Sequence, residues 1–187
     1  IWIAANAEKL KNLAESGEAW AQFGYGCEMY LIDNEQRWLS LSVQWIAKAA
    51  NQGFVPAQMW LVSYERAKED GAESRIDEEQ AHQWVQAACE QGNAHAQYLM
   101  ARICEDHDQI DESVQHDLLA AKGGYTPAYE SLGMAYEYGY GIARDLTKAL
   151  ECYHQGMEKT DDRNGYFAQM WKKLRFKMRY ENGYWQE

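Results

Sequence analysis

Histidines are the residues of this chain best suited to bind a transition metal or to act as general acids and bases, but their spacing supports neither role. A metal-binding helix such as His-Glu-x-x-His places its histidines four positions apart, and this spacing does not occur in the chain. His107 stands among acidic residues and could form a weak metal site, but we favour an ordinary solvated loop histidine. The histidines are His82, His95, His107, His116 and His154. The sequence therefore predicts no metal site and no bound cofactor.

Nucleophilic catalysis has no better support. The Gly-x-Ser-x-Gly motif, which exposes a nucleophilic serine between a strand and a helix, is absent from the sequence. Gly139, Tyr140 and Gly141 follow a predicted helix, whereas a nucleotide-binding glycine loop follows a strand. We therefore predict no catalytic residues and no enzyme activity. A hydrolase remains a remote alternative, because no nucleophile can be paired with a base.

The cysteines favour a reducing compartment. A disulfide-stapled repeat protein would carry a pair of cysteines in every unit, and these four fall at unrelated positions. We expect a cytoplasmic protein, or a periplasmic one if a leader has been removed from a chain that begins at Ile1. Two of the four, Cys89 and Cys152, are interpreted as small core residues. The cysteines are Cys27, Cys89, Cys104 and Cys152.

The elements that position these residues follow from a phrase that occurs four times. It consists of a pair of small residues, a Gly three positions after the second of them, and an Ala four residues after the Gly. The aligned alanines are 36, 39 and 32 residues apart, the period of stacked helical hairpins. The glycines are Gly17, Gly53, Gly92 and Gly124, and the alanines are Ala21, Ala57, Ala96 and Ala128.

Each copy of the phrase predicts a helix, a tight turn and a second helix. Glycine ends a helix by adopting a left-handed conformation, and the alanine lies in the first turn of the next helix. Pro56 and Pro127 precede two of these alanines, where proline at a helix start loses no hydrogen bond. The small residues let neighbouring helices pack closely.

The fourth copy includes residues 136–150, Tyr-Glu-Tyr-Gly-Tyr-Gly-Ile-Ala-Arg-Asp-Leu-Thr-Lys-Ala-Leu. This segment resembles the intra-repeat turn of the Sel-one-like repeat, a relative of the tetratricopeptide repeat, and the Ala-Ala-x-x-Gly phrase resembles the junction between such repeats. Trp45 and Trp84 stand four residues before the small pair, where the family carries an aromatic residue. The resemblance covers about residues 13–157. The first three copies lack the Gly-x-Gly turn, so we expect their inner loops to differ.

The resemblance implies an all-α fold, a right-handed α/α superhelical solenoid of about four Sel-one-like, TPR-like hairpins. It also implies a protein-binding scaffold without chemistry of its own. We predict a single domain over residues 1–187. Its parts are a leading helix over 1–17, repeats over 18–53, 54–92, 93–124 and 125–158, and a basic C-terminal cap over 159–187.

The first helix of each tetratricopeptide repeat lines the concave face of the solenoid. Positions two, six and nine residues after the aligned alanines fall on one helix face. These positions carry aromatic, Met, Arg and Glu side chains, a mixture that suits a groove for a protein segment. Phe23 and Tyr98 are equally consistent with core aromatics. The residues we predict to contact a partner are Trp20, Phe23, Tyr30, Met59, Arg66, Tyr98, Arg102, Glu130 and Met134.

Charge is spread unevenly along the chain. The formal net charge is −11, yet residues 163–180 hold six basic residues and no acid, so the remainder carries −17. Nucleic-acid binding needs a basic groove, so we expect no nucleic-acid partner and instead a basic protein partner. Glu105, Asp106 and Asp108 form an acidic turn that we predict to contact it; the alternative is an ordinary solvated turn.

The basic end of the chain also has two interpretations. A terminal helix must present a polar face to water, and we favour this capping role. The alternative is contact with an acidic partner or an anionic surface through Lys172, Lys173, Arg175 and Arg179. No run of 18 apolar residues is present, so we expect no membrane span.

These observations predict a protein–protein interaction module, an adaptor or scaffold that binds its partner through the concave face as a monomer. The alternative is an immunity or inhibitor protein that neutralises a cognate basic bacterial toxin. The acidic body favours this alternative, as do the 8 Trp and 13 Tyr, residues that dominate interface hot spots.

Overall fold

The computed structural model describes residues 2–32, 36–67, 76–161 and 165–181. Within these ranges the chain forms ten α-helices and no strand, so the predicted all-α, helical-repeat fold class is confirmed. None of these helices is both long enough and apolar enough to cross a membrane. The helices are α1 (Trp2–Glu15), α2 (Ala19–Ile32), α3 (Gln36–Asn51), α4 (Val55–Arg66), α5 (Glu78–Glu90), α6 (Ala94–Asp106), α7 (Ile110–Lys122), α8 (Thr126–Tyr138), α9 (Leu146–Thr160) and α10 (Tyr166–Glu181).

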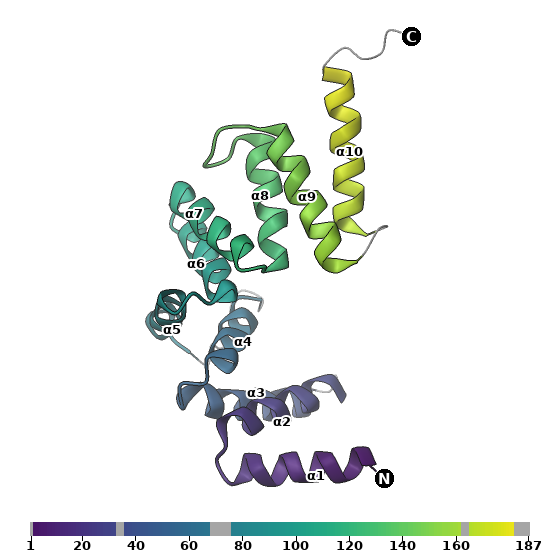
Figure 1. Ribbon diagram of the computed structural model, residues 1–187. Coiled ribbons are helices and arrows are strands. Elements are labelled where there is room, and N and C mark those ends of the chain that lie inside the picture. The colour runs from purple at the N-terminus through teal and green to yellow at the C-terminus, as the bar shows by residue number, and fades with distance from the viewer. Residues whose placement is uncertain (1, 33–35, 68–75, 162–164, 182–187) are drawn as a thin grey trace. The chain divides into compact units, whose positions relative to one another are not determined.

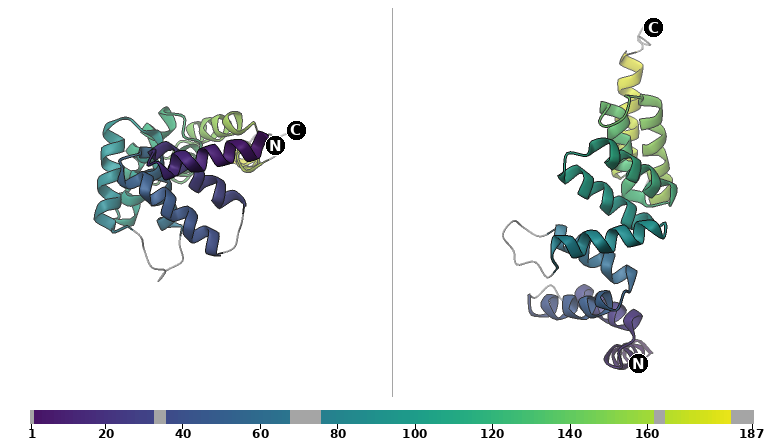
Figure 2. Two further views of the ribbon diagram at one scale, coloured as in Figure 1. Left: turned by 90° about the horizontal axis from the view of Figure 1, so that it is seen from below. Right: turned by 90° about the vertical axis from the view of Figure 1, so that its left-hand side faces the viewer.

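The helices group into two compact units, residues 1–85 and 86–187, which divide within α5. In the first unit, α2 packs against both α1 and α3, and α3 packs against α4. In the second unit, α6 pairs with α7 and α8 with α9, while α7 packs against α8 and α10 packs against α9 (Figures 1 and 2). Within each unit, successive helices therefore pack side by side as stacked hairpins.

The junction between repeats has the same backbone in all four copies. The φ angle is positive at each glycine of the phrase: 103° at Gly17, 82° at Gly53, 75° at Gly92 and 83° at Gly124. In the third copy the N–H of Gly92 donates to the carbonyl of Cys89 (2.9 Å), and the N–H of Asn93 donates to that of Ala88 (3.0 Å). The other three copies repeat both bonds. This is the Schellman ending of a helix, and it confirms the predicted left-handed glycine.

A side chain also ties each junction across its turn. The residue after each aligned alanine is buried and donates a hydrogen bond to the backbone carbonyl eight residues earlier. Because these carbonyls end one helix and the donors begin the next, the bonds hold the two helices at a fixed angle. The bonds join Gln22 to Ala14 (3.2 Å), Gln58 to Ala50 (3.1 Å), Gln97 to Cys89 (3.2 Å) and Tyr129 to Ala121 (2.9 Å).

The turn between α8 and α9 packs tightly on the preceding hairpin. Gly139 and Gly141 have φ of 74° and 65°. A Cβ atom at Gly141 would lie 2.8 Å from Ile110 and 2.9 Å from Val114, so only glycine lets this turn approach α7. The carboxylate of Asp145 then accepts from the N–H groups of the first turn of α9 and caps that helix.

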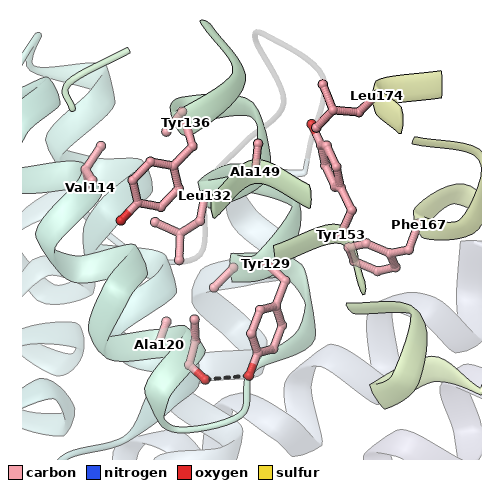
Figure 3. Close-up of a cluster of buried hydrophobic side chains, with 12 residues drawn as sticks. Val114, Ala120, Tyr129, Leu132, Tyr136, Ala149, Tyr153, Phe167 and Leu174 are labelled. Carbon is pink, nitrogen blue, oxygen red and sulfur yellow. Dashed lines mark hydrogen bonds between the residues drawn. The ribbon is translucent and has the colours of Figure 1, made fainter. Parts of the chain in front are cut away.

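Aromatic side chains fill the core of the second unit. Tyr153 on α9 is 1% exposed and lies with Phe167 and Leu174 of α10 (Figure 3). Figure 3 also shows the hydrogen bond from Tyr129 to the carbonyl of Ala121, so this junction bond lies within the same buried cluster. The predicted cap therefore buries one face of α10 against α9, and its basic side chains Lys172, Lys173, Arg175 and Arg179 remain exposed.

Candidate functional site

A groove of about 500 Å³ in the second unit is lined by α6, α7, α8 and the turn that follows α8. Its polar lining includes Arg102 and Glu105 from α6 and Asp117 from α7. Its apolar lining includes Met134 and Tyr138 from α8, with Tyr140 from the turn. The groove thus combines charged groups at its centre with aromatic and methionine side chains.

The charged centre of the groove is a three-residue cluster. Nη2 of Arg102 lies 2.5 Å from Oδ2 of Asp117, and Nη1 lies 2.9 Å from Oε2 of Glu105. The guanidinium also stands 4.9 Å from the centre of the Tyr98 ring, within the range of a cation–π contact. Oε1 of Glu105 accepts from the Ser113 hydroxyl (3.2 Å). These contacts fix Arg102 between α6 and α7.

Asp117 is the most deeply buried charged residue of the cluster. It is 3% exposed, and burial raises its pKa to about 7, although the neighbouring Arg102 opposes that rise. Its Oδ1 atom, like Nε of Arg102, is buried and has no hydrogen-bond partner among the described residues. Buried polar atoms are nearly always hydrogen-bonded. The groove therefore has one acceptor, Oδ1 of Asp117, and one donor, Nε of Arg102, that a ligand could satisfy.

The apolar wall of the groove is open to solvent. The exposed fractions are 42% for Met134, 67% for Tyr138 and 58% for Tyr140. Nζ of Lys177 stands 5.5 Å from the centre of the Tyr138 ring and bonds Oε1 of Glu137 at 3.1 Å. The α10 helix therefore supports the Tyr138 side of the groove through Lys177.

The structure brings together part of the strip predicted for the concave face. Arg102 and Met134 line the groove, and Tyr98 adjoins it through its contact with Arg102. Glu130 is half-buried and hydrogen-bonds to Tyr166, whose pKa is raised to about 12 by burial and by that carboxylate. Glu130 therefore belongs to the contact between α8 and α10 rather than to the lining of the groove.

The other predicted contact residues lie on α2 and α4 of the first unit. Tyr30 packs edge-on against Trp60, with ring centres 5.4 Å apart, and Trp20 is 52% exposed. Phe23 is half-buried and its ring centre is 5.7 Å from that of Phe54. Arg66 is exposed in the last turn of α4. These positions remain a predicted contact surface.

Met59 needs a correction. It was predicted to face a partner, but it is 1% exposed and belongs to the core. The positions two residues after each aligned alanine lie at the border between the buried and exposed faces of their helices. Three of them are half-buried, whereas Met59 is on the buried side. A side chain this deeply buried offers no area to a partner.

The three residues of the predicted acidic turn lie in different environments. Glu105 lines the groove, while Asp106 and Asp108 are exposed at the end of α6. His107 is exposed and its Nδ1 lies 2.8 Å from the carbonyl of Ile103, which fits a solvated loop histidine. Among the described residues, no cluster of three or more potential ligands is placed to hold a metal ion.

Burial raises the pKa of each of the four cysteine thiols above its usual value. Burial raises the pKa of Cys89 and of Cys152 to about 11, so both thiols stay protonated near neutral pH. All four cysteines are free thiols.

Sequence reasoning missed Asp117, although the repeat register contained a signal for it. The residues at the equivalent position of the other repeats are Ile46, Val85 and Tyr153, whose exposed fractions are at most 1%. Asp117 thus places a carboxyl group where the other copies place an aliphatic or aromatic core residue. Tyr138 and Tyr140 were also missed as lining residues. In the sequence they belong to the segment that resembles the intra-repeat turn, and that resemblance does not indicate a contact with α6 or α7.

Comparison with known proteins adds family information to this geometry. A family model described as the Sel1 repeat matches residues 21–54, 59–93 and 126–161, more than half of the chain. The matched segments leave out residues 94–125, which include nearly all of the third repeat together with Arg102 and Asp117. The mouse (Mus musculus) protein DAP3-binding cell death enhancer 1 is 31% identical over 87 residues, which make up 46% of this chain and 17% of that protein.

Two solved structures are similar to this chain. A protective antigen of uropathogenic Escherichia coli with an SLR fold is 31% identical, with a TM-score of 0.64, over 82% of this chain and 33% of that one. A Sel1 repeat protein from Oxalobacter formigenes is 24% identical, with a TM-score of 0.67, over 81% of this chain and 61% of that one. The second likeness concerns the fold alone. This chain spans less than two thirds of the length of each of these three proteins.

Proposed function

The chain belongs to the Sel1 repeat family, and we propose that it is an interaction module whose groove between α6, α7 and α8 binds a segment of a partner protein. Sel1 repeat proteins generally mediate protein–protein interaction, and the family is typically a non-catalytic scaffold. The observation that carries the proposal is the groove, where exposed Met134, Tyr138 and Tyr140 adjoin the buried pair of Arg102 and Asp117.

The composition of the groove supports a protein ligand. Tyrosine, methionine and arginine are enriched in protein interfaces, and tyrosine offers a large contact area at a low cost in conformational entropy. Exposed aromatic side chains beside buried polar groups are the arrangement from which interface hot spots are built. The mouse relative is named for binding a protein, DAP3, which supports this class of function without identifying the partner of this chain. We infer an adaptor or scaffold role.

A photo-crosslinking experiment tests the proposal. The change Tyr140→p-benzoylphenylalanine places the crosslinker in the groove, and Tyr180→p-benzoylphenylalanine places it on the exposed face of α10 as a matched control. In lysate of the source organism, we expect discrete protein adducts from position 140 that disappear when Met134→Lys is added. Identical adducts from both positions, or adducts insensitive to Met134→Lys, would contradict groove binding.

Net charge favours a second candidate function. The formal charge of −11 is complementary to a basic partner, so neutralisation of a basic toxin is the alternative to an adaptor role. Electrostatic steering would give such an inhibitor a fast association rate that falls steeply with added salt. An adaptor would bind more weakly, with a shallow salt dependence, and surface plasmon resonance at two salt concentrations separates the two roles.

A further inference from the structure

The centre of the groove carries an excess of negative charge. Among its described lining residues Arg102 is the one cation, while Glu105 and Asp117 both carry carboxyl groups. Arg102 already bonds both carboxyl groups, so its charge is compensated, and ionisation of Asp117, whose pKa is about 7, leaves one negative charge. The groove therefore attracts a second cation more readily than an anion.

One atom of this cluster is a hydrogen-bond acceptor in need of a donor. Oδ2 of Asp117 bonds Arg102, while Oδ1 is buried with no hydrogen-bond partner among the described residues. A buried carboxylate oxygen without a donor is destabilising, so a ligand that supplies one is favoured. Nε of Arg102 is also unpaired, but an anion approaching it would meet two carboxylates at close range.

The aromatic rings at the groove already interact with cations. The guanidinium of Arg102 lies over Tyr98 at 4.9 Å, and the ammonium of Lys177 lies over Tyr138 at 5.5 Å. Tyr140, at 58% exposure, presents a further ring at the same groove. A lysine or arginine side chain can bury its aliphatic stem against such rings while its charged end reaches the carboxylates.

Packing alone does not account for an aspartate at position 117. The equivalent residues Ile46, Val85 and Tyr153 are at most 1% exposed; Ile46 and Val85 are apolar, and Tyr153 is an aromatic residue whose hydroxyl donates to Glu137. Replacing a buried ion pair by apolar residues of similar volume is often neutral or stabilising, so packing at this position does not require the pair. It also lies within residues 94–125, outside the segments that match the family model.

We propose that the groove selects a lysine or arginine side chain of the bound segment, with Asp117 and Glu105 as its acceptors and Tyr138 and Tyr140 against its stem. This inference rests on the proposed function and specifies the chemistry of the partner. Oδ1 of Asp117 is buried, so side chains of the groove must move before the incoming cation reaches it. The raised pKa of Asp117 supports the proposal, because a second cation would offset the cost of ionising this carboxyl group.

Peptide selection on the full chain provides the test. Short random peptides displayed on phage are selected against the wild-type chain and depleted against the Met134→Lys variant. We expect the selected peptides to share a lysine or arginine. Replacing that residue by norleucine, which keeps an apolar stem, should weaken binding at least about tenfold, because a charge-assisted hydrogen bond is lost. The chain carrying Asp117→Asn should bind the lysine peptide more weakly than wild type and should show a smaller difference between the lysine and norleucine peptides, with Glu105 as the remaining acceptor.

The outcomes separate this inference from the proposed function. Selected peptides that lack a basic residue, or that bind equally well with norleucine, would overturn the cation preference and leave groove binding intact. Failure to select any peptide that distinguishes wild type from Met134→Lys would overturn both. Glu105→Gln is a second variant with a half-exposed side chain, and it should weaken binding of the lysine peptide even if Asp117→Asn fails to fold. Glu90→Gln, on the exposed side of α5, is the control and should bind like wild type.

Discussion

Arg102 on α6 and Asp117 on α7 form an ion pair inside the third repeat, with Nη2 2.5 Å from Oδ2. The Asp117 side chain is 4% exposed and that of Arg102 is 20% exposed, so both charges have lost most of their hydration. Their mutual attraction offsets part of that cost. The pair therefore couples the stability of the third repeat to the chemistry of the groove.

Removing one member of this pair should destabilise the chain. We expect Arg102→Met to lower the free energy of unfolding by roughly 3 kcal/mol, because it leaves the Asp117 carboxylate uncompensated. The double variant Arg102→Met, Asp117→Leu should recover most of that loss, since leucine suits the apolar position of the repeat. Urea denaturation of the three proteins measures this. A double variant no more stable than the single one would show that the pair itself is needed for packing.

Asp117 should make stability depend on pH in a defined direction. Folding raises its pKa from 3.8 to about 7, so the folded chain binds the proton more tightly than the unfolded chain between these values. The contribution of this group to the free energy of unfolding is therefore present at low pH and is lost as the pH rises through about 7. The groups that face it are Arg102, Glu105 and Tyr98, all from α6.

The variant Asp117→Asn isolates this effect. Relative to wild type, it should become more stable on going from pH 5 to pH 8, because only the wild type ionises a buried carboxyl over that range. Denaturation of both proteins at the two pH values gives the comparison. A stability difference that stays constant with pH would mean that Asp117 titrates near its ordinary value.

The side-chain bonds across the repeat junctions should each contribute to stability. Tyr129→Phe removes the hydroxyl that donates to the carbonyl of Ala121 at 2.9 Å and keeps the ring in place. We expect it to cost about 1 kcal/mol of the free energy of unfolding. Tyr180→Phe, at a residue 74% exposed, is the matched control and should change little. Equal stability of both variants would show that the bond from Tyr129 to Ala121 does not contribute to the free energy of unfolding.

Two helical glycines should respond oppositely to alanine. A Cβ at Gly133 on α8 would lie 2.4 Å from the ring of Tyr153, whereas one at Gly24 on α2 would lie 3.6 Å from Leu10. We expect Gly133→Ala to destabilise the chain by about 1 to 3 kcal/mol through overpacking. Gly24→Ala should stabilise it by roughly 0.5 to 1 kcal/mol through helix propensity. Thermal unfolding by circular dichroism distinguishes these signs, and a stable Gly133→Ala variant would show that the α8–α9 contact can relax.

The local structure of this chain could be predicted from sequence because its signals are local. The glycine of each phrase has no side chain to oppose a positive φ, and the small pair before it lets two helices approach. The helical hairpins, their period and the proline positions in the first turns of α4 and α8 followed from these rules. The family resemblance depended on the same residues.

The makeup of the candidate site depended on contacts between the successive helices α6, α7 and α8. Met59 and Arg102 occupy neighbouring rows of the same predicted strip, yet one is 1% exposed and the other lines a groove. Helical periodicity gives the direction of a side chain only relative to its own helix, and a few tens of degrees of rotation decide between core and surface.

The sequence by itself determined the repeats, the helix ends and the class of fold, because each depends on residues within one turn of the backbone. Only the tertiary structure decided that Asp117 meets Arg102, that its second oxygen lacks a donor and that Tyr138 and Tyr140 stand beside them. The physical reason is that burial and charge pairing are properties of neighbours in space. Three helices had to pack before these residues could share a groove.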